Sequence, residues 1–402
     1  MALITIDEPK LKSPPKGFAL FALGFRPFFL AAAVFAVVYM GLWVTTLHGT
    51  IQAPVGLASA AWHGHEMLFG YAVAVIAGFL LTATQKWTSI PMPKGGPLAA
   101  LFALWLAGRL VPFLPGMPYA VGAIVDLLFL PVLLAAVLRP VLRARQARNY
   151  AFSIMLLGMT VANILFHAAP LGYGPAYSLI GLSLALYLVV LMIVVMGGRV
   201  IPYFTERRVG FTARKWQAVE WLAPATTVAV MATVFATRLW NIGNDLLVPL
   251  AATAAIVHAI RLAGWQDKRL WEVPLLWVLH LGYGWIVTGF ALDALAAAGL
   301  VSPFLAMHAY VTGGIGVLTL GMMSRVALGH TGRPLEVPRI MPWAFAAMNL
   351  SAAVRVFGPM LAPAQTPLLY QLGGAIWMAA FAAFAVIYAP MLWRPRADGK
   401  PG

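Results

Sequence analysis

Twelve apolar stretches of about 20 residues follow one another along the chain, and this pattern constrains the fold more than any other feature. A stretch of that length crosses the hydrocarbon core of a bilayer as a helix. Hydrophobic residues make up 62% of the 402 residues and charged residues only 10%, a balance that excludes soluble globular, disordered and collagen-like proteins. The runs are continuous rather than alternating, which argues against a β-barrel. We therefore predict an all-α polytopic membrane protein with one membrane-embedded domain over residues 1–402. Its twelve predicted transmembrane helices are 22–47, 61–84, 97–114, 119–138, 150–169, 176–198, 217–237, 246–264, 273–297, 303–327, 342–361 and 368–392.

The distribution of basic residues predicts the orientation. If the N-terminus is cytoplasmic, 23 of the 27 Lys and Arg lie on the cytoplasmic side, as the positive-inside rule expects. The exceptions are Arg26, Arg109, Arg238 and Arg355. The net charge of +15 is thus explained by topology and by contact with anionic membrane lipid, and we expect no nucleic-acid partner. Both termini are predicted to be cytoplasmic, the N-terminal run is too long for a cleaved signal, and the longest loop is expected around 199–216.

The absence of cysteine removes several chemistries. With no Cys in the sequence, disulfides, iron–sulfur clusters and thiolate-bound haem are excluded. Motifs for nucleotide binding, for serine or cysteine nucleophiles and for zinc hydrolysis are also absent. The glycines Gly313, Gly314 and Gly316 are expected to allow close helix packing. Function must therefore be sought among the few polar residues inside the spans.

A weak internal repeat relates distant spans. When the second and tenth spans are aligned without gaps, His65 matches His308. Arg109 follows His65 by 44 residues, and Arg355 follows His308 by 47. Spans two, six and ten run in the same direction, so we consider an arrangement of three four-helix repeats.

The densest polar cluster lies at the start of the second span, in Trp62-His63-Gly64-His65-Glu66-Met67. Residues two apart on an α-helix point about 200° apart, so His63 and His65 serve two different sites if both bind metal. Imidazole is a common ligand of haem iron and copper. Glu66 could hydrogen-bond a ligand ring, relay protons or bind metal directly.

Five histidines fall near the outer ends of spans: His48, His63, His65, His167 and His308. The alternative to metal binding is interfacial anchoring, because His, Trp and Tyr favour the headgroup region. Five histidines on one side together with a carboxylate favour metal binding, whereas His48 taken alone fits an interfacial position. Of the other three histidines, His258 and His330 fit structural roles.

Two interpretations are possible for each of three further residues. Arg109 and Arg355 could grip cofactor carboxylates such as haem propionates, or could extend toward outer headgroups. His280 shares a helix face with Tyr283, three residues on. This pair could be a metal ligand beside a phenol, or an interhelical hydrogen bond.

Several segments resemble the NnrS family, and the likeness covers nearly the whole chain. The segment of residues 62–70, with its His-x-His-Glu-Met core, carries the most specific part. The other similar segments are 24–29, 78–83, 163–167, 198–202, 204–205, 279–283, 307–309, 322–326 and 329–333. The resemblance implies a bacterial inner-membrane protein that contains haem and copper and is associated with denitrification and the response to nitric oxide and nitrosative stress. It implies no agreed catalytic activity.

The resulting hypothesis places a b-type haem between His65 and His308, with Arg109 and Arg355 near its propionates. A second haem or a copper would use His63 with His167, with His48 or Glu66 as further ligands, and His280 is another candidate metal ligand. Twelve spans and histidines on spans two and ten resemble subunit I of haem–copper oxidases. That likeness is a fold-level analogy only: the sixth span lacks the histidine expected of a copper ligand, and the His-x-His pair lies on span two instead of span ten.

Nitric oxide binding or turnover is the function that this hypothesis favours. A reductase would need electrons from quinol or a donor protein, and Glu66 and Tyr283 are the candidates for proton transfer. Two alternatives remain at this level: a transporter of metal, haem or a metal–nitrosyl species, and a haem-based sensor without turnover.

Overall fold

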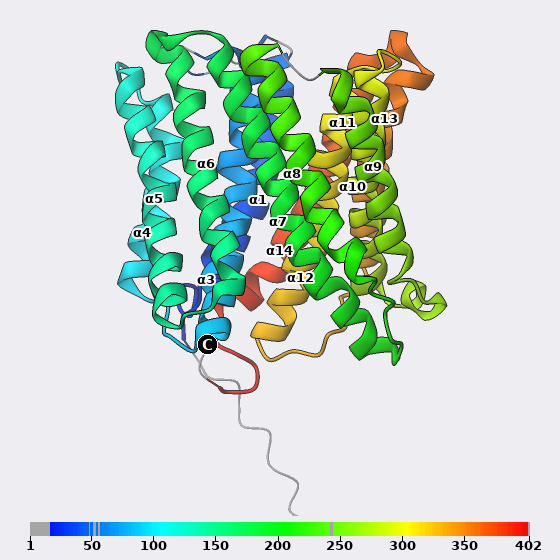
Figure 1. Ribbon diagram of the computed structural model, residues 1–402. Coiled ribbons are helices and arrows are strands. Elements are labelled where there is room, and N and C mark those ends of the chain that lie inside the picture. The colour runs from blue at the N-terminus through cyan, green and yellow to red at the C-terminus, as the bar shows by residue number, and fades with distance from the viewer. Residues whose placement is uncertain (1–16, 48, 51–53, 55–56, 242–243, 401–402) are drawn as a thin grey trace, which may run out of the picture.

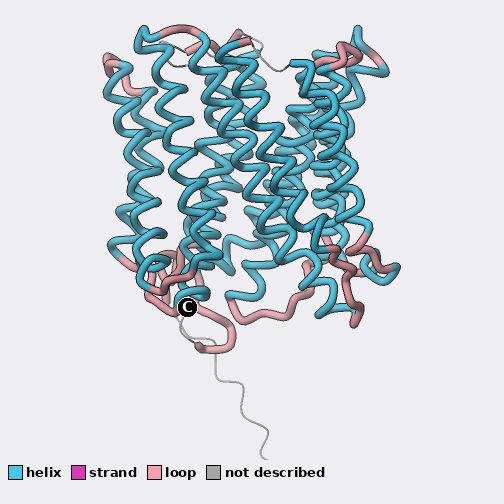
Figure 2. The backbone as a smooth tube through the Cα atoms, in the orientation of Figure 1, coloured by secondary structure: helices cyan, strands magenta, loops and turns pink. Residues whose placement is uncertain are grey.

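The computed structural model describes residues 17–400 except 48, 51–53, 55–56 and 242–243. Over these residues the chain is helical and contains no strand (Figure 2). Twelve helical spans in this part of the chain are long and apolar enough to cross a membrane, which confirms the prediction of a polytopic helical protein. They stand side by side as one bundle (Figure 1). The α-helices are α1 (Phe25–Leu47), α2 (Ser59–His65), α3 (Val73–Thr88), α4 (Gly96–Leu110), α5 (Tyr119–Arg143), α6 (Tyr150–Ala168), α7 (Ala176–Val209), α8 (Gln217–Trp240), α9 (Asn244–Ala263), α10 (Pro274–Ala297), α11 (Pro303–His308), α12 (Leu318–His330), α13 (Met341–Leu361) and α14 (Thr366–Trp393).

In the described part of the chain, three spans contain a wider π-helical segment, and each segment begins one or two residues after a histidine. The π segments are η1 (Glu66–Ala72), η4 (Ala169–Tyr173) and η6 (Ala309–Val317). His65 ends α2 and His308 ends α11, so the second and tenth spans share the order α, π, α. In the fifth span, His167 stands one residue before the end of α6. Single π turns occur often at functional sites. The remaining elements are the 3₁₀ turns η2 (Val111–Phe113), η3 (Ala147–Asn149), η5 (Lys268–Glu272) and η7 (Pro363–Gln365).

The sixth span is longer than expected. Helix α7 continues through Pro202 to Val209, so the first half of the loop predicted at 199–216 is helical. The helix ends where Gly210 adopts a left-handed φ of 65° and donates its N–H to the carbonyl of Glu206. The length of the apolar run predicts only the part of the helix that lies in the hydrocarbon. The helical backbone hydrogen bonds continue into the basic residues that follow this run.

The two described ends of the chain lie together at one end of the bundle. The N–H of Ala19 donates to the carbonyl of Trp393 at 2.7 Å. The Arg26 guanidinium donates to the carbonyls of Leu392 at 2.9 Å and Arg394 at 2.7 Å. Arg26 therefore lies at the same end as the C-terminal basic residues, and its treatment as an exception to the charge rule was wrong. The C-terminal end is at the bottom of the bundle in Figure 1.

Glycines allow α10 and the tenth span to approach closely. A Cβ added at Gly313 would lie 2.3 Å from the Trp285 ring, and one at Gly289 would lie 2.3 Å from the Tyr310 ring. Such distances leave no room for a side chain, so these glycines fix the separation of the two helices. The packing role expected for the glycines in 313–316 agrees with this geometry. The close contact sets the position of η6 and of His308, which directly precedes it.

Candidate functional site

Helix α2 presents two histidines to different surroundings, as their spacing predicts. His65 is buried against α5 and α6, where it meets Asp126 and His167. His63 lines a large cavity on another side of the helix. The molecule therefore contains two candidate sites on different sides of one helix.

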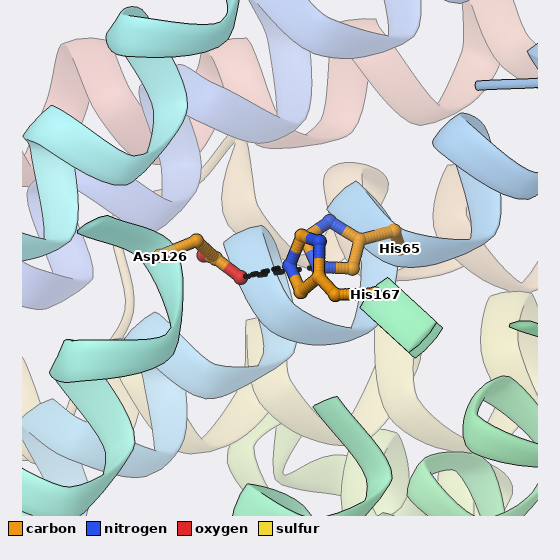
Figure 3. Close-up of side chains that lie close together, drawn as sticks. All are labelled: His65, Asp126 and His167. Carbon is orange, nitrogen blue, oxygen red and sulfur yellow. Dashed lines mark hydrogen bonds and ion pairs between the residues drawn. The ribbon is translucent and has the colours of Figure 1, made fainter. Parts of the chain in front are cut away.

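The first site is a buried group of two imidazoles and one carboxylate, His65, Asp126 and His167 (Figure 3). One ligand atom from each lies within 4.8 Å of the others, and it is the group of this kind found in the described part of the chain. Asp126 Oδ2 is 3.2 Å from His65 Nε2 and 3.0 Å from His167 Nε2. Two imidazoles and a carboxylate are a donor set for copper, zinc and iron.

Neighbouring side chains orient both imidazole rings of this group. The other nitrogen of His65, Nδ1, is 3.0 Å from Glu66 Oε1. The Tyr119 hydroxyl is 2.7 Å from His167 Nδ1. Hydrogen bonds of this kind fix the tautomer and the direction of a metal-binding histidine. Of the roles considered for Glu66, the geometry fits the hydrogen bond to a ligand ring.

The charges around this group favour the binding of a cation. Arg109 donates to Glu66 Oε2 at 2.8 Å and also pairs with Asp126. The guanidinium offsets one of the two carboxylate charges. A metal cation bound to the two imidazoles would pair with the other carboxylate charge.

The second site is a cavity of about 930 Å³, near the upper end of the range for cofactor pockets. His63 and His308 both line it. Its walls are otherwise mostly apolar. Residues along them include Met40, Leu68, Leu182, Leu186, Val311 and Trp377.

The hydrogen bonds of His308 fix which of its ring nitrogens carries the lone pair. Nδ1 lies 2.6 Å from the carbonyl oxygen of Phe304 and so carries the proton. Nε2 therefore holds a lone pair, which accepts a hydrogen bond from Arg355 at 2.9 Å. The Arg355 guanidinium also stacks over the Tyr370 ring, 3.4 Å from its centre. This is the tautomer that a metal-binding histidine requires.

The ring of His63 is held by stacking instead of hydrogen bonds. It stacks on Trp43 with ring centres 4.2 Å apart and on Tyr39 at 6.2 Å. Its Nδ1 is buried with no hydrogen-bond partner among the described residues. A buried polar atom without a partner is unusual in a folded protein. The imidazole is therefore placed on the cavity wall at a cost that a bound group would offset.

Charged residues also reach the cavity wall. Arg238 and Arg355 supply two guanidinium groups that can pair with carboxylates. Asp293 accepts hydrogen bonds from the hydroxyls of Tyr187 at 2.6 Å and Tyr310 at 2.7 Å. The cavity thus combines apolar walls, two imidazoles and two guanidinium groups, which are the requirements of a flat macrocycle bearing two carboxylates.

The structure pairs the histidines differently from the sequence-based hypothesis. His65 lies with His167, not with His308, and His63 shares its cavity with His308. Arg109 does not line the cavity, because its guanidinium is engaged by the carboxylates beside His65. The helical spacing predicted two sites but could not show which neighbouring helix each histidine faces.

Other candidates lie outside both sites. His280 directs both ring nitrogens at backbone carbonyls, Leu276 at 2.9 Å and Trp265 at 3.3 Å, an arrangement that suits a structural role. Tyr283 does not contact His280 through its hydroxyl. That hydroxyl is 2.7 Å from Nδ1 of His258 and 3.1 Å from Arg261. His48 lies outside the described residues.

Sequence reasoning missed several residues of the two sites, among them Tyr119, Asp126, Asn163, Asp293 and Arg238. Asn163 Oδ1 is 3.0 Å from His65 Nε2, and its amide donates to Asp126 at 2.7 Å. The signal for the two aspartates was present, because a carboxylate in the middle of an apolar span is costly and usually functional. The argument that selects the histidines and arginines applies equally to the acidic residues of the fourth and ninth spans.

Comparison with known proteins gives one family. The family model described as NnrS protein matches residues 19–396, nearly the whole chain. No curated protein matches the chain.

Proposed function

Because the chain belongs to the NnrS family, we propose that it is a haem- and copper-containing protein of the bacterial inner membrane that binds nitric oxide or turns it over. The observation that carries this proposal is the pair of sites on α2: a cavity with two imidazoles and two guanidinium groups, beside a buried group of two imidazoles and one carboxylate. Each site has the donors that one of the two cofactors needs.

The large cavity is the proposed haem site. His63 and His308 would hold the iron, and Arg238 and Arg355 would pair with the propionates, with Arg355 giving up its hydrogen bond to Nε2 of His308. Haem iron would supply one-electron exchange, and it would bind nitric oxide when one of the two imidazoles is released. The residues themselves exclude water through apolar walls and keep a lone pair on Nε2 of His308 through its bond to Phe304.

The buried group is the proposed copper site. His65, His167 and Asp126 would be the ligands, while Glu66 and Tyr119 keep the rings in place. Arg109 balances part of the carboxylate charge. If the protein is a reductase, electrons would come from quinol or a donor protein, and Glu66 is the proposed proton-transfer group beside the metal.

Cofactor analysis of single variants tests the assignment. The measurements are haem content, copper content and optical spectra of purified protein, before and after anaerobic addition of nitric oxide. We expect His63→Ala and His308→Ala to lose haem and keep copper. We expect His65→Ala and His167→Ala to lose copper and keep haem. His280→Ala is the matched control, since this buried histidine belongs to neither site.

Two results would contradict the proposal. Loss of haem in His65→Ala but not in His63→Ala would restore the pairing first inferred from the sequence. Colourless wild-type protein that accumulates metal in vesicles would indicate a transporter instead of a cofactor-containing protein.

A further inference from the structure

A second, smaller cavity, with a volume of about 120 Å³, opens partly to the outside of the bundle. Of the described residues that line it, Thr319 alone has a polar side chain. The Thr319 hydroxyl is already engaged, 2.5 Å from the Tyr71 hydroxyl and 2.7 Å from the carbonyl of Ile315. The apolar wall includes Phe29, Val75, Ile76, Val189, Met192 and Val200.

The chemistry of this wall selects what can occupy the cavity. A buried water needs two to four polar partners, which this wall does not offer. Empty apolar cavities of about 150 Å³ stay dry and bind benzene or xenon. The space is too small for a haem. A small uncharged apolar molecule is the occupant that fits both its size and its lining.

The small cavity continues the large one along the same helices. On α7, Leu186 lines the large cavity and Val189 the small one, about 4.5 Å apart along the axis. On the tenth span, Val311 lines the large cavity and Ile315, four residues further, lines the small one. The two spaces therefore follow one another along these helices.

We infer that the small cavity is a binding site for a small apolar gas, which it takes up from the membrane interior and holds beside the large cavity. The identification of the gas as nitric oxide rests on the proposed function; the site itself does not. Nitric oxide is an uncharged diatomic molecule of low polarity, so it enters hydrocarbon and needs no hydrogen-bond partner in the cavity.

Xenon is the probe that tests the site without reference to nitric oxide. Crystals of the full chain are pressurised with xenon, and its anomalous signal is located. We expect xenon in the small cavity of the wild type and its loss in Ile76→Trp, where the indole fills the space. The matched control is Ile154→Trp, because Ile154 lies on α6 and is 67% exposed on the lipid-facing surface. If Ile76→Trp does not fold, Val200→Phe fills the cavity from α7.

The outcomes separate this inference from the proposed function. Absence of xenon from the wild-type cavity, or a lipid chain found there, overturns the gas site. In haem-loaded protein, we expect Ile76→Trp to slow nitric oxide binding several-fold with an unchanged optical spectrum, and Ile154→Trp to bind at the wild-type rate. Xenon binding with unaltered nitric oxide kinetics overturns delivery to the large cavity. Protein without haem would overturn the proposed function, while the xenon result would still decide the gas site.

Discussion

At the residue scale, Asp126 holds the proposed copper site together. Its carboxylate meets both imidazoles and the Arg109 guanidinium. Asp126→Asn keeps the shape but removes the charge, and we expect copper affinity to fall at least about 10-fold. The same substitution at Asp293, which faces the large cavity, is the control and should leave copper affinity unchanged. Metal titration of purified protein measures the difference, and equal affinities for both variants would remove Asp126 from the ligand set.

Tyr283 was a candidate for proton transfer, but its contacts predict a structural role. Its hydroxyl joins two buried groups, His258 and Arg261. Tyr283→Phe leaves both without that partner, which costs about 1–3 kcal/mol of stability. We expect a lower thermal unfolding midpoint in detergent with unchanged haem and copper content. A variant with normal stability and impaired nitric oxide consumption would return Tyr283 to the catalytic candidates.

Part of the candidate site could be predicted from the sequence, because a polar side chain buried in a membrane is energetically costly and usually has a function. His63, His65, His167 and His308 could be found in this way, and their helical spacing separated His63 from His65. The partners could not be found, because they depend on how α2 is rotated against α5, α6 and the tenth span. That rotation is set by side-chain packing between helices, and this packing cannot be inferred from a local sequence pattern.

At the element scale, the positions of the spans could be predicted but their internal form could not. Apolar length determines where a helix crosses hydrocarbon, and all twelve spans were located by it. The π segments η1 and η6 have no hydrophobic signature, since a wider turn buries the same residue types. The π segments nevertheless determine the direction in which the helix after each histidine faces.

Close packing between α10 and the tenth span gives an element-scale prediction. In Gly289→Ala the new Cβ would lie 2.3 Å from the Tyr310 ring, so that ring or the helix must shift. Overpacking of this kind costs about 1–3 kcal/mol. Gly284→Ala, on the same helix, meets nothing closer than 3.8 Å and is the matched control. Thermal unfolding should show a lower midpoint for the first variant and no decrease for the second. Equal midpoints would mean that α10 and η6 are less tightly packed than described.

At the scale of the whole molecule, the arrangement places both candidate sites on one helical span. Because α2 contributes His63 to the cavity and His65 to the buried group, neither site can form without the correct rotation of that helix. Helices α5 and α6 complete one site, and the tenth span together with α8 and α13 completes the other. In both sites the histidines meet residues that are distant in the sequence. The sequence could therefore indicate two sites but not which residues belong to each.

The orientation of this bundle in the membrane is the last prediction. The described chain ends share one end of the bundle, and most basic residues lie on loops that return to it, so the positive-inside rule makes that end cytoplasmic. The chain has no cysteine, so a single introduced thiol reports its own location. Ala298 is exposed after α10 and Thr212 is exposed between α7 and α8, at opposite ends of the bundle. In intact cells stripped of their outer membrane, a maleimide that cannot cross the inner membrane should label Ala298→Cys at once. Thr212→Cys should react only after permeabilisation. The reverse pattern would invert the molecule and place both cofactor sites in the cytoplasmic half of the membrane, where quinol and proton access would have to be reconsidered.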